Sequence, residues 1–249
     1  MSSTILRGAR VCQPWLQGEL DALCGPYAAI NALRVVLFPG AILNGRDSRR
    51  LLAAGLTCLS HDTRLERACV AGISSTKLYR LTRHLAERAE RLGRCKLVVR
   101  RPPNKQWTRA KLLTTIDEAH GDGAAVIVGL GNRYDHFTVI VGVWGARYLL
   151  FDSGRMQWIT RESIGTDKSK RRFRLAPSDV IIVKGGADSS ASPAPYDGNW
   201  PPWAEDEPVE LETEGDPITT PPDWLPAVTR QPPEARRDNR RTEHPSSEG

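Results

Sequence analysis

The sequence lacks any long apolar run. No stretch of about 18 apolar residues occurs in its 249 residues, which excludes a transmembrane helix. The first residues, Met1–Gln13, carry two arginines, but no apolar segment follows them, so they do not form a secretory signal. We therefore expect a soluble, cytoplasmic protein with no membrane partner, and the sequence leaves open its export by a specialised secretion route.

Cysteine is also scarce. There are five cysteines, Cys12, Cys24, Cys58, Cys69 and Cys95. An odd number at irregular spacing makes a poor disulfide framework, and no C-x-x-C pair is present for zinc. No helix-turn-helix, zinc finger or base-stacking motif occurs either, so the net charge of +6 does not favour nucleic acid as a partner.

The composition divides the chain near Lys184. Residues 1–184 carry a net charge of +15, whereas residues 185–249 carry −9 and contain 12 of the 18 prolines. The second part has too few aliphatic residues to offset its chain entropy by burial. We expect a folded domain over 1–184 and a disordered, acidic, proline-rich tail over 185–249. The acidic tail is expected either to balance the charge of the basic body or to lie over it and compete with an acidic substrate segment.

Tryptophan is unusual in a tail that only keeps a protein in solution. The tail contains Trp200-Pro201-Pro202-Trp203 and Pro221-Pro222-Asp223-Trp224-Leu225. These segments are either chance occurrences or short docking motifs for a partner.

The body has mixed periodicity. Apolar residues at helical spacing predict helices over 23–37 and 74–92, and Thr108 caps a third that ends near His120. Strands are expected afterwards. Their ranges are 97–99, 124–130, 136–144, 148–152, 156–159 and 180–183. Helices followed by an antiparallel sheet indicate an α+β fold.

A candidate nucleophile stands at the start of the first helix. Cys24 is followed by Gly25 and Pro26 and then by an apolar run. A helix N-terminus stabilises a thiolate through its dipole and its unpaired N–H groups, which can also bind a developing oxyanion. Gly25 would leave room for a substrate carbonyl, and Pro26 suits a first turn because its missing N–H is not needed there.

A candidate base and acid follow on two strands. His136 begins the apolar strand 136–144, and Asp152 ends the next one. An acid in this place can orient the histidine ring through its second nitrogen. The other histidines lack this strand context, and His120, near a helix end, is expected to gain from the helix dipole as a cation.

Cysteine at a helix start, then histidine and aspartate on neighbouring strands, resembles the papain-like cysteine peptidases. The pattern is similar to that of the bacterial peptidases that remove double-glycine leader peptides and, more loosely, to phytochelatin synthase. The resemblance covers three short segments within 1–184. It implies a papain-like core with N-terminal helices and a C-terminal antiparallel sheet, and Cys24, His136 and Asp152 as the catalytic residues.

The chain departs from this pattern in two places. The families usually place an oxyanion-hole glutamine six residues before the cysteine, where this chain has Gly18, so Gln17 is the candidate. Ser153 stands where the leader peptidases commonly have proline.

The register of the two strands is a further condition. A strict two-residue turn at Gly145-Ala146 would put Asp152 on the opposite sheet face from His136. The triad therefore requires a longer loop or a bulge, for which Gly142 is the favoured position.

The resulting hypothesis is a thiol peptidase or isopeptidase that acts on a protein or peptide substrate without a metal or organic cofactor. Cys24 would form a thioester, with His136 as base, Asp152 as orienting acid, and Gln17 with the Cys24 N–H as oxyanion hole. Two alternatives stay open. An acyltransferase or transamidase would use the same residues with an amine as acceptor, and an inactive binding module would act through its tail.

Overall fold

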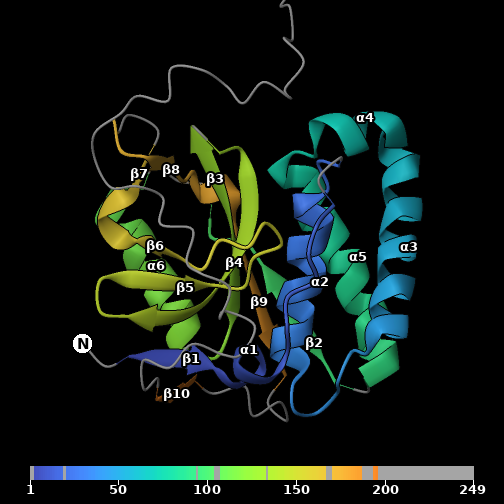
Figure 1. The fold of residues 1–249 in the computed structure, drawn as a ribbon, viewed down its shortest axis with the longest axis horizontal. Helices are drawn as coiled ribbons and strands as arrows, with labels where there is room; N and C mark the ends of the chain where they lie inside the picture. Colours follow the sequence, from blue (N-terminus) through green and yellow to red (C-terminus); the bar gives the residue numbers. More distant parts are fainter. Residues whose placement is uncertain are drawn as a thin grey trace, which may run out of the picture. The chain divides into compact units, whose positions relative to one another are not determined.

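The computed structural model describes residues 3–18, 21–93, 95–103, 107–132, 134–166, 170–186 and 193–195. The fold is mixed α/β, with most helices on one side of Figure 1 and the sheet on the other. The helices are α1 (Arg7–Val11), α2 (Cys24–Leu37), α3 (Gly45–Asp62), α4 (Leu65–Ala71), α5 (Ser75–Gly93) and α6 (Arg109–Gly121).

Ten short strands form the sheet. They are β1 (Thr4–Leu6), β2 (Leu97–Arg100), β3 (Ala125–Asn132), β4 (His136–Trp144), β5 (Arg147–Leu150), β6 (Trp158–Thr160), β7 (Ile164–Gly165), β8 (Phe173–Arg174), β9 (Val180–Gly185) and β10 (Pro193–Pro195). All described pairs are antiparallel except β7 with β8. β4 lies centrally, since it pairs with β3, β1 and β5. The expected α+β class, helices followed by an antiparallel sheet, agrees with this arrangement.

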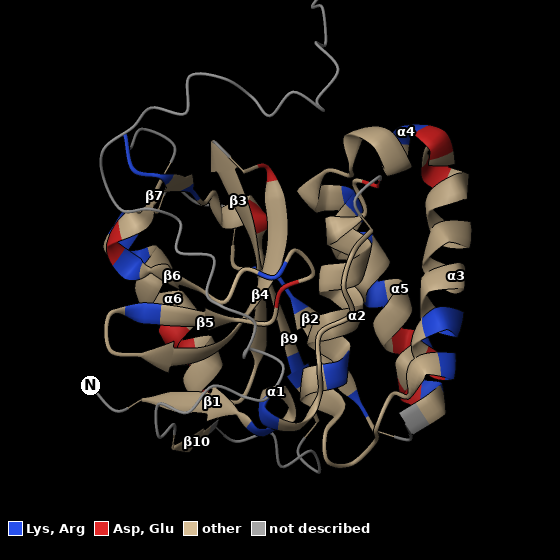
Figure 2. Ribbon diagram, in the orientation of Figure 1, with Lys and Arg blue, Asp and Glu red and all other residues tan. Residues whose placement is uncertain are grey.

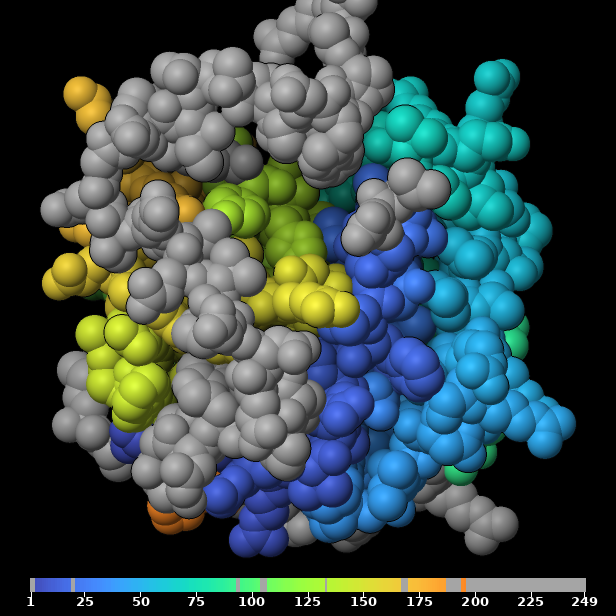
Figure 3. Space-filling view, viewed as in Figure 1, coloured from blue at the N-terminus to red at the C-terminus, as the bar shows by residue number. Residues whose placement is uncertain are grey.

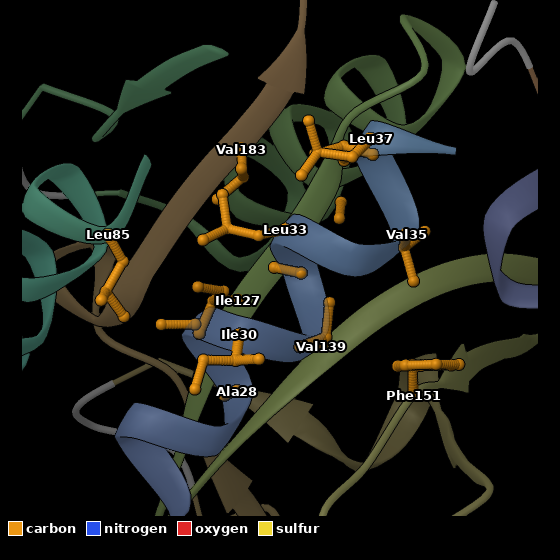
Figure 4. Close-up of a cluster of buried hydrophobic side chains, with 14 of the residues drawn as sticks. Ala28, Ile30, Leu33, Val35, Leu37, Leu85, Ile127, Val139, Phe151 and Val183 are labelled. Carbon is orange, nitrogen blue, oxygen red and sulfur yellow. The ribbon is translucent and has the colours of Figure 1, made fainter. Parts of the chain in front are cut away.

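Helix α2 forms the centre of the main core. Twelve of its 14 residues are buried, so it is apolar on nearly every side. Figure 4 shows Ile30, Leu33 and Leu37 of this helix among Ile127, Val139 and Val183 of the sheet and Leu85 of α5. A second buried cluster lies on the other face of the sheet, beneath α6, and includes Ile116, Val128 and Tyr148. The two clusters pack against the two faces of the sheet.

The predicted helices α5 and α6 are confirmed to within about two residues, the usual uncertainty of helix ends. Thr108 is the N-cap of α6, and its hydroxyl accepts a hydrogen bond from Lys111 N–H. In α5, Leu78, Leu81 and Leu85 are buried as expected, but Leu92, at the helix end, is 47% exposed. The basic face of this helix (Arg80, Arg83, Arg88 and Arg91) is exposed. Figure 2 marks basic residues along α3 and α5 in blue.

The folded region continues past the predicted boundary at Lys184. β9 extends to Gly185, and Pro193–Pro195 adds an edge strand to β1, so the prediction of a tail that begins at 185 was wrong by about ten residues. Proline is tolerated at a sheet edge, where its missing N–H faces outward. The rest of the predicted tail, 196–249, lies outside the described residues. Within the described residues, no helix has the length and apolarity needed to span a membrane.

Candidate active site

Cys24 is the first residue of α2, as the sequence predicted. The Cys24 side chain is largely buried. The N-cap residue is Leu23, whose side chain makes no capping hydrogen bond. The helix start is fixed instead by Asp21, whose Oδ1 accepts a hydrogen bond of 3.0 Å from Leu23 N–H. The sulfur therefore stands at a helix N-terminus, where the unpaired backbone N–H groups favour a negative charge.

The glycine at position 25 has a role in helix packing, besides the room for a substrate carbonyl that the sequence suggested. A Cβ at this position would lie 3.2 Å from two carbons of Ile73 and 3.4 Å from Leu78 Cδ1. The missing side chain thus allows α2 to approach the start of α5. Packing between helices accounts for Gly25, and the expected space for a substrate carbonyl is not needed to explain it.

His136 is the first residue of β4, and it contacts both other members of the predicted triad. Its Nε2 lies 2.7 Å from Asp152 Oδ1. Cys24 is close enough to the ring to raise the pKa of His136, and because Nε2 faces Asp152, Nδ1 is the nitrogen that is left for Cys24. The side chain of His136 is 16% exposed, so the imidazole is shielded from water on most sides.

Asp152 lies at the bottom of a tight loop that follows β5. The residue is 2% exposed. Its Oδ1 meets His136, and its Oδ2 accepts hydrogen bonds from Gly154 N–H at 2.7 Å and Met156 N–H at 3.0 Å. The loop closes around the carboxylate with Arg155 at φ 66°. Every partner of this buried carboxylate is a donor, so the charged form is compensated and the acid is held in one orientation.

The electrostatics of the pair favour an imidazolium. Burial alone would lower the pKa of His136, but the hydrogen bonds with Asp152 and Cys24 and the negative charges of these groups outweigh it and raise that pKa to about 10. Burial alone would raise the pKa of Asp152, yet the hydrogen bond and charge of His136, with the Met156 N–H, hold it below its usual value. Asp152 is therefore ionised and His136 positively charged around neutral pH.

A β-bulge brings Asp152 to the correct face. Trp144 pairs with Arg147, as expected for the two-residue turn, but the register between β4 and β5 shifts between Ile140 and Gly142. The extra residue on β4 moves β5 along by one, and Phe151 N–H donates to Val139 O at 2.8 Å. The β-bulge that the sequence predicted near Gly142 is therefore present.

Gln17 lies between the other site residues. Its backbone N–H donates to Ser153 O at 3.0 Å, next to Asp152, and its side-chain Nε2 donates to the carbonyl of Asp21, three residues before Cys24. Figure 3 shows the loop after Asp152, in yellow, against the blue N-terminal segment. An amide nitrogen carries two N–H donors, so the Asp21 carbonyl occupies one of them. The structure thus brings Gln17 to the loop beside Cys24.

Three residues of this site were not identified from the sequence. Asp21 fixes the start of α2, Ser153 holds Gln17, and Gly154 lies against the His136–Asp152 pair. A Cβ on Gly154 would come within 3.1 Å of Asp152 Oδ2 and 3.5 Å of His136 Cε1. The glycine two residues after a candidate acid was the available signal, because a close backbone approach often requires glycine.

The remaining histidines lie elsewhere. His120 is 2% exposed and its Nε2 is 3.0 Å from the Thr4 hydroxyl. Burial lowers the pKa of His120 to about 4, so the ring is neutral at neutral pH. The prediction that His120 is a cation stabilised by the helix end was therefore wrong. Among the described residues, no group of three His, Cys, Asp or Glu side chains could hold a metal ion.

Comparison with known proteins adds no relative. The chain matches no protein-family model, and no curated protein matches its sequence.

Proposed function

We propose that this protein is a papain-like cysteine peptidase or isopeptidase that acts on a protein or peptide substrate. The observation that carries the proposal is the contact of one imidazole, His136, with a helix-borne cysteine on one side and a buried carboxylate on the other. This is the relation of nucleophile, base and orienting acid in triad hydrolases, which are recognised by geometry and roles. The cysteine on a helix and the histidine on a strand also agree with the papain-like resemblance of the sequence.

The first half-reaction forms a thioester. His136 already holds the proton of the Cys24 thiol as an imidazolium, and Sγ attacks the carbonyl carbon of the scissile amide. The oxyanion of the tetrahedral intermediate accepts hydrogen bonds from the Cys24 N–H and the Gln17 amide. The C–N bond then breaks, His136 returns the proton to the leaving amine, and the acyl group stays on Cys24.

The second half-reaction releases the acid. His136 takes a proton from a water molecule, whose oxygen attacks the thioester carbon. The C–S bond breaks as the second tetrahedral intermediate collapses, and the proton passes to the Cys24 thiolate. Asp152 keeps the ring oriented through both steps, and its buried, donor-filled position suits this role.

The test is labelling of the full chain with a thiol-reactive peptidyl electrophile, followed by mass spectrometry. Fast modification at Cys24 alone is expected, and it should slow at least about 100-fold in His136→Ala because the base is removed. Cys69→Ala is the matched control, since this half-buried thiol lies next to the Cys24 segment through the Ala22 N–H to Cys69 O hydrogen bond. Slow labelling spread over several cysteines, unchanged in His136→Ala, would refute the proposal.

A further inference from the structure

A stack of two tryptophans and an arginine lies on the sheet away from the candidate active site. The Arg147 guanidinium carbon is 5.2 Å from the ring centre of Trp144 and 4.0 Å from that of Trp158. We call these three residues the Trp–Arg–Trp stack. All three are half-buried. Cation–π contacts with both rings hold the arginine in place, so the stack is a preformed aromatic and cationic surface.

The register places the three side chains on one face. Trp144 is directly opposite Arg147, and Trp158 is opposite Leu149, two residues further along β5. Residues two apart on a strand share a face, so the stack runs across β4, β5 and β6 beside Leu149 of the main core. Trp144 and Trp158 are two strand spacings apart across the sheet and offset by two residues along it, so their backbones are roughly 12 Å apart.

The chain leaves its last described strand at the same end of the sheet. Pro195 pairs with Thr4, Thr4 with Val143, and Val143 with Tyr148. Trp144 is the next residue after Val143, so Pro195 lies two strands from the stack, and Figure 1 shows β1, β5 and β6 near one another on the left. The five residues from Pro195 to Trp200 can span up to about 17 Å, which is enough to reach it.

The segment that arrives there has matching chemistry. Trp200-Pro201-Pro202-Trp203 follows Pro195 closely, and its prolines favour a polyproline II helix. In a helix of that kind, which has three residues per turn and a rise of about 3.1 Å, two residues three apart in the sequence lie on one side at a spacing of about 9 Å. Proline-rich segments bind to surfaces lined by aromatic rings, and the acids that follow at 205–207 complement Arg147.

We propose that Trp200–Trp203 of this chain docks on the Trp–Arg–Trp stack and anchors the acidic part of the tail to the β4–β6 face. A short tether gives the segment an effective concentration in the millimolar range, so even a weak intrinsic affinity fills the surface. This inference does not depend on the proposed peptidase activity.

The test uses the full chain, with variants in the tail that leave the folded domain unchanged. A fluorescent peptide of residues 196–208 is titrated into the wild type, the double variant Trp200→Ala/Trp203→Ala, and Trp224→Ala. We expect the double variant to bind the peptide about tenfold more tightly than the wild type, where the tethered segment competes. Trp224→Ala, which alters the second Pro-Trp segment, should behave as the wild type.

A second measurement reports on the surface itself. The indole N–H signals of Trp144 and Trp158 in NMR spectra should shift in the double variant and not in Trp224→Ala. Arg147→Gln in the double variant should weaken peptide binding, provided that its unfolding midpoint is unchanged. Equal peptide affinities and unshifted indole signals across all chains would overturn the proposal. A second outcome would also overturn it: a proline-rich peptide without tryptophan that binds the wild type and the double variant with equal affinity. The surface would then serve a foreign partner and would not hold the tail.

Discussion

Removal of the Asp152 charge should lower the pKa of His136. The wild-type value of about 10 arises from hydrogen bonds and charges of both Asp152 and Cys24, opposed by burial. Asp152→Asn keeps the shape of the side chain but removes its negative charge, so the imidazolium loses stabilisation. A hydrogen bond to a charged group is worth about 1.5–3 kcal/mol, and one pH unit corresponds to about 1.4 kcal/mol. The titration midpoint of His136 should therefore fall by about 1–2 pH units.

The assay is an NMR titration of the His136 Cε1–H signal, assigned with His136→Ala. Asp117→Asn is the matched control, because Asp117 also pairs with a cation, Arg161, and with the Tyr148 hydroxyl, in a part of the fold away from the triad. The control should leave the His136 midpoint unchanged. A wild-type midpoint near the ordinary 6.5, or equal midpoints in the wild type and Asp152→Asn, would refute the argument that Asp152 sets the charge of the base.

Three further outcomes are expected. Gly154→Ala should slow Cys24 labelling about 10- to 100-fold with little change in unfolding midpoint, because its Cβ would press on Asp152 and His136; equal labelling rates would contradict this. Gly8→Ala should cost about 2–3 kcal/mol in urea denaturation, because its Cβ would collide with the backbone carbonyl of Val35, whereas Gly121→Ala, with no atom within 4 Å, is the control. His120 has a folded pKa of about 4, below its unfolded value, so its contribution to stability is complete above pH 6.5 and is lost as the pH falls towards 4. The wild type should lose about 2 kcal/mol more than His120→Gln between pH 7 and pH 5, and equal losses would exclude His120 as the source.

The sequence revealed the elements that carry a continuous apolar signal. α2 and β4 are buried runs; the start of β4 at His136 was predicted to the residue and that of α2 to within one residue. α3 was missed, because only Ser48, Leu51, Gly55 and Leu59 of its 18 residues are buried and its pattern is broken by glycine and polar residues. β10 was missed because Pro-Ala-Pro is a poor strand sequence, which only the free edge of β1 accommodates.

The candidate site could be predicted only in part, because contacts between distant segments leave no mark in the sequence. Local chemistry identifies a cysteine at a helix start and a histidine at a strand start. Gln17 is held by the Ser153 carbonyl, a tertiary contact that no spacing in the sequence predicts. Asp21 acts locally instead, through the Leu23 N–H two residues further on. Gly25 has a packing role against Ile73 and Leu78 that the sequence did not reveal, and the expected room for substrate stays a prediction.

The β-bulge links the fold to the candidate site, because this backbone feature decides which face of the sheet the Asp152 carboxylate occupies. Gly142 lies where β1, β4 and β5 meet, and a Cβ there would come within 2.9 Å of both Leu149 Cδ1 and Thr4 O. The glycine therefore lets β1 and β5 flank β4 closely while the register shifts by one residue. With Phe151 N–H on Val139 O, Asp152 lies across from Thr138, on the same face as His136. A regular ladder would have turned Asp152 away, so the orienting acid of the proposed triad depends on one glycine about ten residues from it along the chain.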